Sequence, residues 1–289
     1  MDTANRRGKI KIIISMVIFS TIGILRRNIP YSSGLIAFAR GSIGAVFLIL
    51  LAFLRKTPFN KYAIKNNLFL LLLSGAAIGF NWILLFEAYS YTTVAIATLC
   101  YYMAPVFVIL LAPVVLREKI TQKRIICVLL ATIGIVLVTG VFEDASTRLT
   151  PEQFTGILFG LAAAALYGSV ILMNKKMSPI PAYDKTIIQL VIASATLFPY
   201  VLLSEPTCAF KFDYMSVILL LVAGIVHTAI AYALYFSSIE KLKVNTVALL
   251  SYIDPVLAVV LSAVVLKEPM RLSAIAGAVL VLGASFVSE

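Results

Sequence analysis

VAIATLCYYMAPVFVILLAPVVLREK, residues 94–119, returns later in the chain as VNTVALLSYIDPVLAVVLSAVVLKEP, residues 244–269. At one constant spacing the identical pairs of the two stretches include Tyr102 and Tyr252, Pro105 and Pro255, Val115 and Val265, and Glu118 and Glu268. Weaker similarities precede each stretch. Because a fixed internal period marks a repeated structural unit, the sequence predicts two copies, residues 1–142 and 143–289.

The composition indicates that these copies are solvated by lipid. Of the 289 residues, 61% are hydrophobic and 13% are charged, whereas soluble domains carry about a quarter charged residues. A helix needs about 20 apolar residues to cross a bilayer. We therefore expect an all-α membrane protein with ten spans, five in each copy, over the approximate ranges 10–26, 30–54, 67–88, 92–115, 122–142, 153–174, 185–204, 214–238, 244–266 and 271–288.

Other features narrow the class of protein. The segments between the apolar runs are short, so we expect no soluble domain, and a basic nucleic-acid surface has no place to form. Cys100, Cys127 and Cys208 lie far apart, which fits neither a metal site nor a disulfide framework, and we expect no metal and no cofactor. The first apolar run follows a basic flank as a signal peptide does, but no small-residue cleavage site follows it. We expect that it is retained as the first span.

The distribution of Lys and Arg predicts the orientation. Most of the 24 basic residues lie in the segments 6–11, 55–65, 117–124, 175–185 and 241–243. Short loops rich in Lys and Arg stay on the cytoplasmic side. Both termini are therefore predicted to lie in the cytoplasm, with the protein in the cytoplasmic membrane and its basic loops facing anionic lipid headgroups.

An odd number of spans in each copy places the two copies in opposite orientations, as in the inverted repeats of secondary transporters. With its Tyr-Pro motifs and its REK and KEP endings, the chain resembles the drug/metabolite transporter superfamily, EamA type, over essentially its whole length. The resemblance implies a ten-helix carrier with alternating access. Its central cavity is lined by spans 1 to 4 and 6 to 9, and spans 5 and 10 are peripheral.

Ionisable residues within the spans are costly, so each is a candidate for function. Asp254 lies near the middle of the ninth span, directly before Pro255, and either faces the cavity or pairs with a neighbouring helix. Arg40 has small neighbours on its helix face. Because an arginine keeps its proton, Arg40 either clamps an anionic substrate group or neutralises Asp254 or Glu87.

Two further ionisable residues have open roles. Glu87 is placed near the outer end of the third span, where it binds substrate or is simply solvated. His227 is the only histidine, and it either relays protons or packs between helices. The candidates for proton coupling are Asp254, Glu87 and His227.

Polar and aromatic residues complete the predicted substrate site, which comprises Arg40, Glu87, Asp254, Asn81, Trp82, Tyr102 and Tyr252. Aromatic rings can bind cations through their faces, although tyrosines also bond helices together or lie at the membrane interface. Pro105 and Pro255 are predicted as hinges, because proline removes a helical hydrogen bond.

These residues favour a secondary active transporter of a small polar metabolite, most plausibly an exporter of an amino acid or a similar zwitterion. The alternative substrate is an organic cation or drug. A membrane-embedded enzyme is disfavoured, because one histidine and no catalytic cluster are present, and a passive channel does not require two kinked copies. The expected partners are the small-molecule substrate and membrane lipid, with no nucleic acid, in a monomer or homodimer.

Overall fold

The computed structural model describes residues 3–117, 121–138, 150–204, 213–239, 242 and 244–288. Within these ranges every regular element is a helix, and the prediction of an all-α fold is confirmed. The helices are α1 (Thr3–Ser20), α2 (Ile22–Arg27), α3 (Ser33–Leu54), α4 (Lys61–Asn66), α5 (Leu68–Tyr91), α6 (Val94–Tyr101), α7 (Ala104–Leu116), α8 (Gln122–Val138), α9 (Pro151–Lys176), α10 (Ala182–Ser204), α11 (Tyr214–Gly224), the π-helix η2 (Ile225–Ile230), α12 (Ala231–Ile239), α13 (Val244–Ser251), α14 (Ile253–Val264) and α15 (Leu272–Ser288).

Seven helical segments of the described chain are long and apolar enough to cross a membrane. They are Arg6–Arg27, Ser33–Leu54, Leu68–Tyr91, Val94–Leu116, Pro151–Lys176, Ala182–Leu203 and Tyr214–Tyr235. Two shorter apolar helices, Ile253–Val264 and Leu272–Ala284, follow them. The count of ten spans stays a prediction.

Both copies of the repeated stretch are broken at the same place. α6 ends at Tyr101 and α7 begins at Ala104, while α13 ends at Ser251 and α14 begins at Ile253. Pro105 and Pro255 therefore do not lie inside an unbroken α-helix, and their role as hinges stays a prediction. Pro105 and Pro255 lie in the first turn of α7 and α14. The N–H groups of a first turn have no acceptor within the helix, so proline loses no helical hydrogen bond there.

The ends of the two stretches share an uncommon backbone conformation. Arg117 has a φ of 58° and Lys267, at the matching position, has a φ of 54°. A left-handed conformation costs a non-glycine residue roughly 1–2 kcal/mol. Its occurrence at the same position in both stretches indicates that they share local structure as well as sequence.

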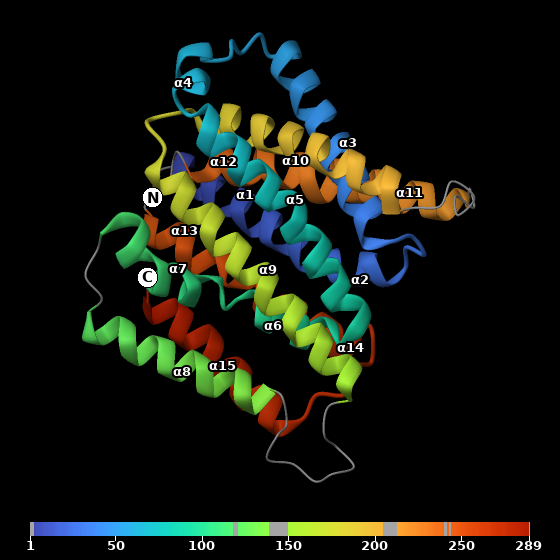
Figure 1. The fold of residues 1–289 in the computed structure, drawn as a ribbon, viewed down its shortest axis with the longest axis vertical. Helices are drawn as coiled ribbons and strands as arrows, with labels where there is room; N and C mark the ends of the chain where they lie inside the picture. The colour runs from blue at the N-terminus through green and yellow to red at the C-terminus, as the bar shows by residue number, and fades with distance from the viewer. Residues whose placement is uncertain are drawn as a thin grey trace.

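Helices of the two halves pack against one another throughout the core. α9 packs along α5, α10 packs on α3 and α5, α12 packs on α1, and α14 packs on α6. α8 and α15 pack side by side along one edge of the molecule (Figure 1). This is the place that the family resemblance implied for spans 5 and 10.

Local sequence signals fix where several helices begin. The Thr150 hydroxyl and the Gln153 side chain form a reciprocal capping box at the start of α9, which satisfies two backbone N–H groups that the helix leaves unpaired. At the start of α11 the Asp213 carboxylate accepts hydrogen bonds from the Ser216 amide and hydroxyl. Because these bonds favour the ionised form, they lower the pKa of Asp213.

Candidate functional site

Arg40 is a charged residue enclosed between the halves. It lies on α3 and is 5% exposed. Its guanidinium carbon is 4.4 Å from the centre of the Trp82 ring and 5.8 Å from that of Phe86. A cation over an aromatic face is stabilised by the ring's quadrupole, so Trp82 supports the charge from one side.

Only one side chain in the described structure holds Arg40 by a hydrogen bond. The Nε atom donates to the Thr228 hydroxyl at 2.8 Å, and Thr228 donates to the Ala223 carbonyl at 3.0 Å. Arg40 makes no ion pair with a described carboxylate, so the structure does not contain the predicted neutralisation by Asp254 or Glu87. No hydrogen bond joins its two terminal nitrogens to another described residue, and these are the atoms through which arginine binds anions in a bidentate geometry.

A π-helical turn places Thr228 against Arg40. Thr228 lies in η2, and its hydrogen bond spans five residues, to Ala223. Glycine at position 44 allows the approach, because a Cβ there would lie 2.6 Å from the Thr228 methyl carbon. π-Helical turns of this kind often occur at functional sites, and the sequence analysis missed both the turn and Thr228.

Asp254 is held by a tyrosine of the other half. It lies in the first turn of α14, is half-buried, and accepts a hydrogen bond from the Tyr102 hydroxyl at 2.7 Å. Tyr89 lies within electrostatic range of both Asp254 and Arg40. The two opposite charges thus occupy the same core without pairing with each other.

Tyrosines lie around the two charges. Tyr101 stacks on Tyr167 with ring centroids 5.4 Å apart and is edge-on to Tyr102 at 6.3 Å. The Tyr101 hydroxyl donates to Asn81, whose amide donates to the Ala163 carbonyl at 2.5 Å. The oxygen and the nitrogen of the Asn81 side-chain amide are therefore both hydrogen-bonded, and they join α5 to α6 and α9.

His227 joins η2 to the first span. Its Nε2 atom lies 2.9 Å from the Thr21 hydroxyl, and that hydroxyl donates its proton to the Ile18 carbonyl at 2.8 Å. Its Nδ1 atom lies 3.4 Å from the Val222 carbonyl, so both ring nitrogens face oxygen atoms and the tautomer decides which of them donates. Its geometry is that of a packed, hydrogen-bonded histidine, and proton coupling through it stays a prediction.

Two further predicted site residues have neighbours other than Arg40 and Asp254. Glu87 is half-buried on α5 and lies within electrostatic range of Arg26, at the end of α2. The Tyr252 ring packs edge-on against Phe286 of α15, with centroids 5.5 Å apart. The structure thus does not group Glu87 or Tyr252 with Arg40.

Glu268 closes one end of the molecule, a role that the sequence analysis did not assign. Its carboxylate accepts hydrogen bonds from Arg27 at 3.1 Å, from the Val94 amide at 2.9 Å and from the Ser262 hydroxyl. These contacts join α2 and the start of α6 to the end of α14. The Arg27 contact is the only ion pair between described residues, and we call the three contacts together the Glu268 closure.

The opposite end is packed differently. α6 and α14 are in contact beside the Glu268 closure, whereas α7 and α13, the other halves of the same two broken stretches, do not pack closely within the described structure. Tyr167, on the α7 side of the site, is 40% exposed and within electrostatic range of Asp254.

Known proteins are similar to this chain in sequence, and a solved structure is similar to it in fold. The uncharacterized transporter YxxF of Bacillus subtilis (strain 168) is 29% identical over 255 residues, covering 88% of this chain and 80% of the relative. Protein RarD of Salmonella typhimurium (strain LT2) is 27% identical over 211 residues, covering 72% of this chain and 65% of the relative. A solved crystal structure aligns with a TM-score of 0.65 over 97% of this chain and 95% of its own, at 16% identity, which shows a shared fold.

The profile of the EamA-like transporter family matches the chain twice, over residues 6–140 and again over residues 154–288. The two matches span both copies of the repeated stretch, and together they cover almost the whole length. With its apolar helical spans, the chain is an integral membrane protein that belongs to the EamA-like transporter family.

Proposed function

We propose that this protein is a secondary active transporter of a small zwitterionic metabolite, such as an amino acid, and that it works as an exporter. One observation carries the proposal. A guanidinium and a carboxylate lie among helices of both halves, hydrogen-bonded to Thr228 and to Tyr102, yet neither is neutralised by the other in the described structure. A substrate with a carboxylate and an ammonium group satisfies both, since burying an unpaired charge is costly.

The two ends of the molecule suggest how such a site is exposed in turn. In the predicted orientation, with both termini cytoplasmic, the Glu268 closure lies on the outer side and the site faces the cytoplasm. The inverted copies then exchange roles, and the site opens outward when α6 separates from α14 and α7 approaches α13. Inverted repeats of this kind support alternating access around a fixed central site.

The test is a thermal-stability screen of the purified full-length protein. Amino acids, simple carboxylates, amines and quaternary ammonium compounds are added one at a time. A ligand present at about 100 times its dissociation constant stabilises the folded state by about 2.7 kcal/mol. We expect stabilisation by zwitterions that exceeds stabilisation by either half of the molecule alone.

Two variants make the test specific. Arg40→Lys keeps the charge and removes the bidentate fork, and Asp254→Asn removes the negative charge. Each should weaken stabilisation by zwitterions, whereas Glu152→Gln, an exposed carboxylate on α9, serves as the control. Zwitterion binding that survives both variants would refute the two-ended site. Uptake of the stabilising ligand into proteoliposomes is then measured under an imposed ion gradient. Accumulation beyond the ligand's electrochemical equilibrium distinguishes active transport from a channel.

An organic cation is the second candidate substrate, and one observation favours it. The stacked pair Tyr101 and Tyr167 adjoins Tyr102, which donates to Asp254, and aromatic faces near a carboxylate bind cations. On this alternative, quaternary ammonium compounds stabilise the protein, Asp254→Asn abolishes the effect and Arg40→Lys leaves it unchanged.

A further inference from the structure

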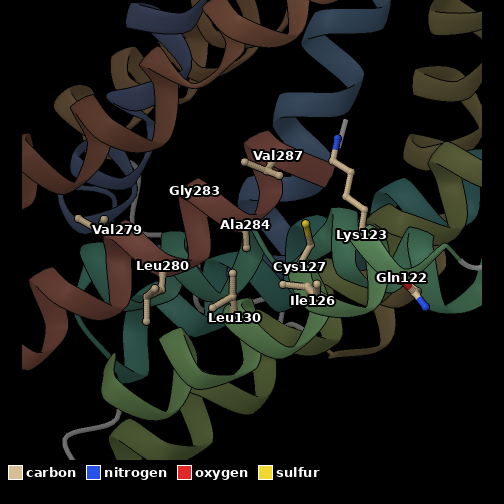
Figure 2. Close-up of a pocket in the computed structure, with 10 residues that line it drawn as sticks. All are labelled: Gln122, Lys123, Ile126, Cys127, Leu130, Val279, Leu280, Gly283, Ala284 and Val287. Atoms are coloured by element: carbon tan, nitrogen blue, oxygen red, sulfur yellow. The ribbon is translucent and has the colours of Figure 1, made fainter.

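A hollow of about 490 Å³ lies between α8 and α15, away from the charged site. Figure 2 shows side chains of both helices around it, with Lys123 and Gln122 at one end. The remaining lining is apolar and includes Ile126, Leu130, Val279 and Leu280. Volumes of roughly 300–1,000 Å³ are typical of small-molecule sites.

Glycines explain why the hollow opens where it does. A Cβ at Gly277 would lie 2.4 Å from the Gly134 carbonyl oxygen, and one at Gly134 would lie 2.8 Å from that of Gly277. The two helices are therefore in backbone contact at this point. A Cβ at Gly283 meets nothing within 4 Å, so the space near the end of α15 is open.

The surroundings decide the chemistry of an occupant. α8 and α15 form an edge of an integral membrane protein (Figure 1), and Ile126, Leu130 and Val279 are exposed there. Such a surface is covered by hydrocarbon in the bilayer. If the hollow were empty, its lining residues would lack van der Waals contacts on one side. An apolar chain in the hollow supplies those contacts.

A charge at the mouth of the hollow adds selectivity. Lys123 is exposed and makes no hydrogen bond or ion pair with the described part of the chain. It lies at the beginning of α8, where the helix leaves the apolar region, and Gln122 beside it offers amide donors. Basic groups at the ends of paired membrane helices bind anionic lipid headgroups.

We propose that this hollow binds one anionic phospholipid, with an acyl chain between α8 and α15 and the headgroup phosphate at Lys123. The site is independent of the transported substrate, because it lies outside the core that holds Arg40 and Asp254. Its ligand class is set by two features together, an apolar hollow and an unpaired ammonium group at its open end.

The experiment is native mass spectrometry of the full-length protein in detergent, titrated with phosphatidylglycerol or phosphatidylcholine of the same chain length. Wild type should retain one phosphatidylglycerol in preference to phosphatidylcholine. Lys123→Gln should weaken phosphatidylglycerol binding about fivefold, which corresponds to about 1 kcal/mol for one basic residue, and should leave phosphatidylcholine unchanged. Lys65→Gln, at another exposed basic residue, is the matched control.

A second variant tests the hollow itself. Gly283→Leu should fill the space and weaken binding of both lipids, whereas Val114→Leu, at an exposed position outside the hollow, should not. Equal affinity for the two lipids in wild type would overturn the proposal. So would binding that is insensitive to Gly283→Leu, which indicates ordinary annular lipid, or a dimer mass that Gly283→Leu abolishes, which indicates a second copy in the hollow.

Discussion

Removing the charge of Glu268 should open the closed end of the transporter. Its carboxylate is 12% exposed and accepts from the amide of Val94, the first residue of α6, where a negative charge is also favoured by the helix dipole. Hydrogen bonds to a charged group contribute about 1.5–3 kcal/mol. The Arg27 side chain is 36% exposed. Solvent therefore screens its ion pair with Glu268, which contributes less than about 1 kcal/mol to the closed state.

Glu268→Gln keeps one acceptor oxygen and loses the charge. We therefore expect the closed state to lose about 1–2 kcal/mol, which raises the ratio of open to closed molecules roughly 5- to 30-fold. The assay is electron–electron double resonance in nanodiscs, with spin labels at Tyr91 and Leu272, two exposed positions beside the closure. The labelled variants are made in a protein whose native cysteines have been replaced, so that only the introduced cysteines are labelled.

The expected result is growth of a longer-distance population in Glu268→Gln. Glu152→Gln removes an exposed carboxylate that makes no contact with the closure, so it should leave the distances unchanged. An unaltered distance distribution in Glu268→Gln, with the fold intact, would refute the reasoning, because it would mean that these contacts do not hold α6 to α14.

Three further predictions concern the site and its scaffold. Thr228→Val removes the acceptor that orients the buried guanidinium and should weaken zwitterion binding about tenfold in a thermal-shift titration, while Thr228→Ser retains it. Tyr102→Phe should lower the free energy of unfolding by about 1–3 kcal/mol, and the same change made in Asp254→Asn should cost less, as a double-mutant cycle measures. Gly277→Ala should destabilise the protein by about 1–3 kcal/mol through overpacking, whereas Gly283→Ala should be nearly neutral in thermal unfolding.

The fold was largely predictable because its physical determinants are local. A long apolar run specifies a helix by its length, and the expected span 30–54 is close to Ser33–Leu54 in the structure. The helix breaks were less predictable. A proline in an apolar run fits either a kink or the first turn of a new helix, and the structure chooses the second at both Pro105 and Pro255.

The site was predictable in its charges and not in its contacts. Arg40 and Asp254 stood out because ionisable groups in an apolar run are rare. Their partners lie far away in the chain: Thr228 for Arg40, through a π-helical turn, and Tyr102 for Asp254. No periodicity in the sequence signals a π-turn, since helical patterns follow a period of 3.6 residues.

The two matching tyrosines show how a repeated sequence yields an asymmetric site. Tyr102 donates to Asp254, a carboxylate that only the second copy has, because the matching position in the first copy is Ala104. Without a matching carboxylate on the first copy, Tyr252 packs on Phe286 instead. The difference of Asp against Ala therefore gives different hydrogen-bond partners to two tyrosines that the repeat makes equivalent, and it makes the charged site asymmetric in a scaffold built from two similar halves. A zwitterion, the substrate that we propose, would then bind in one orientation.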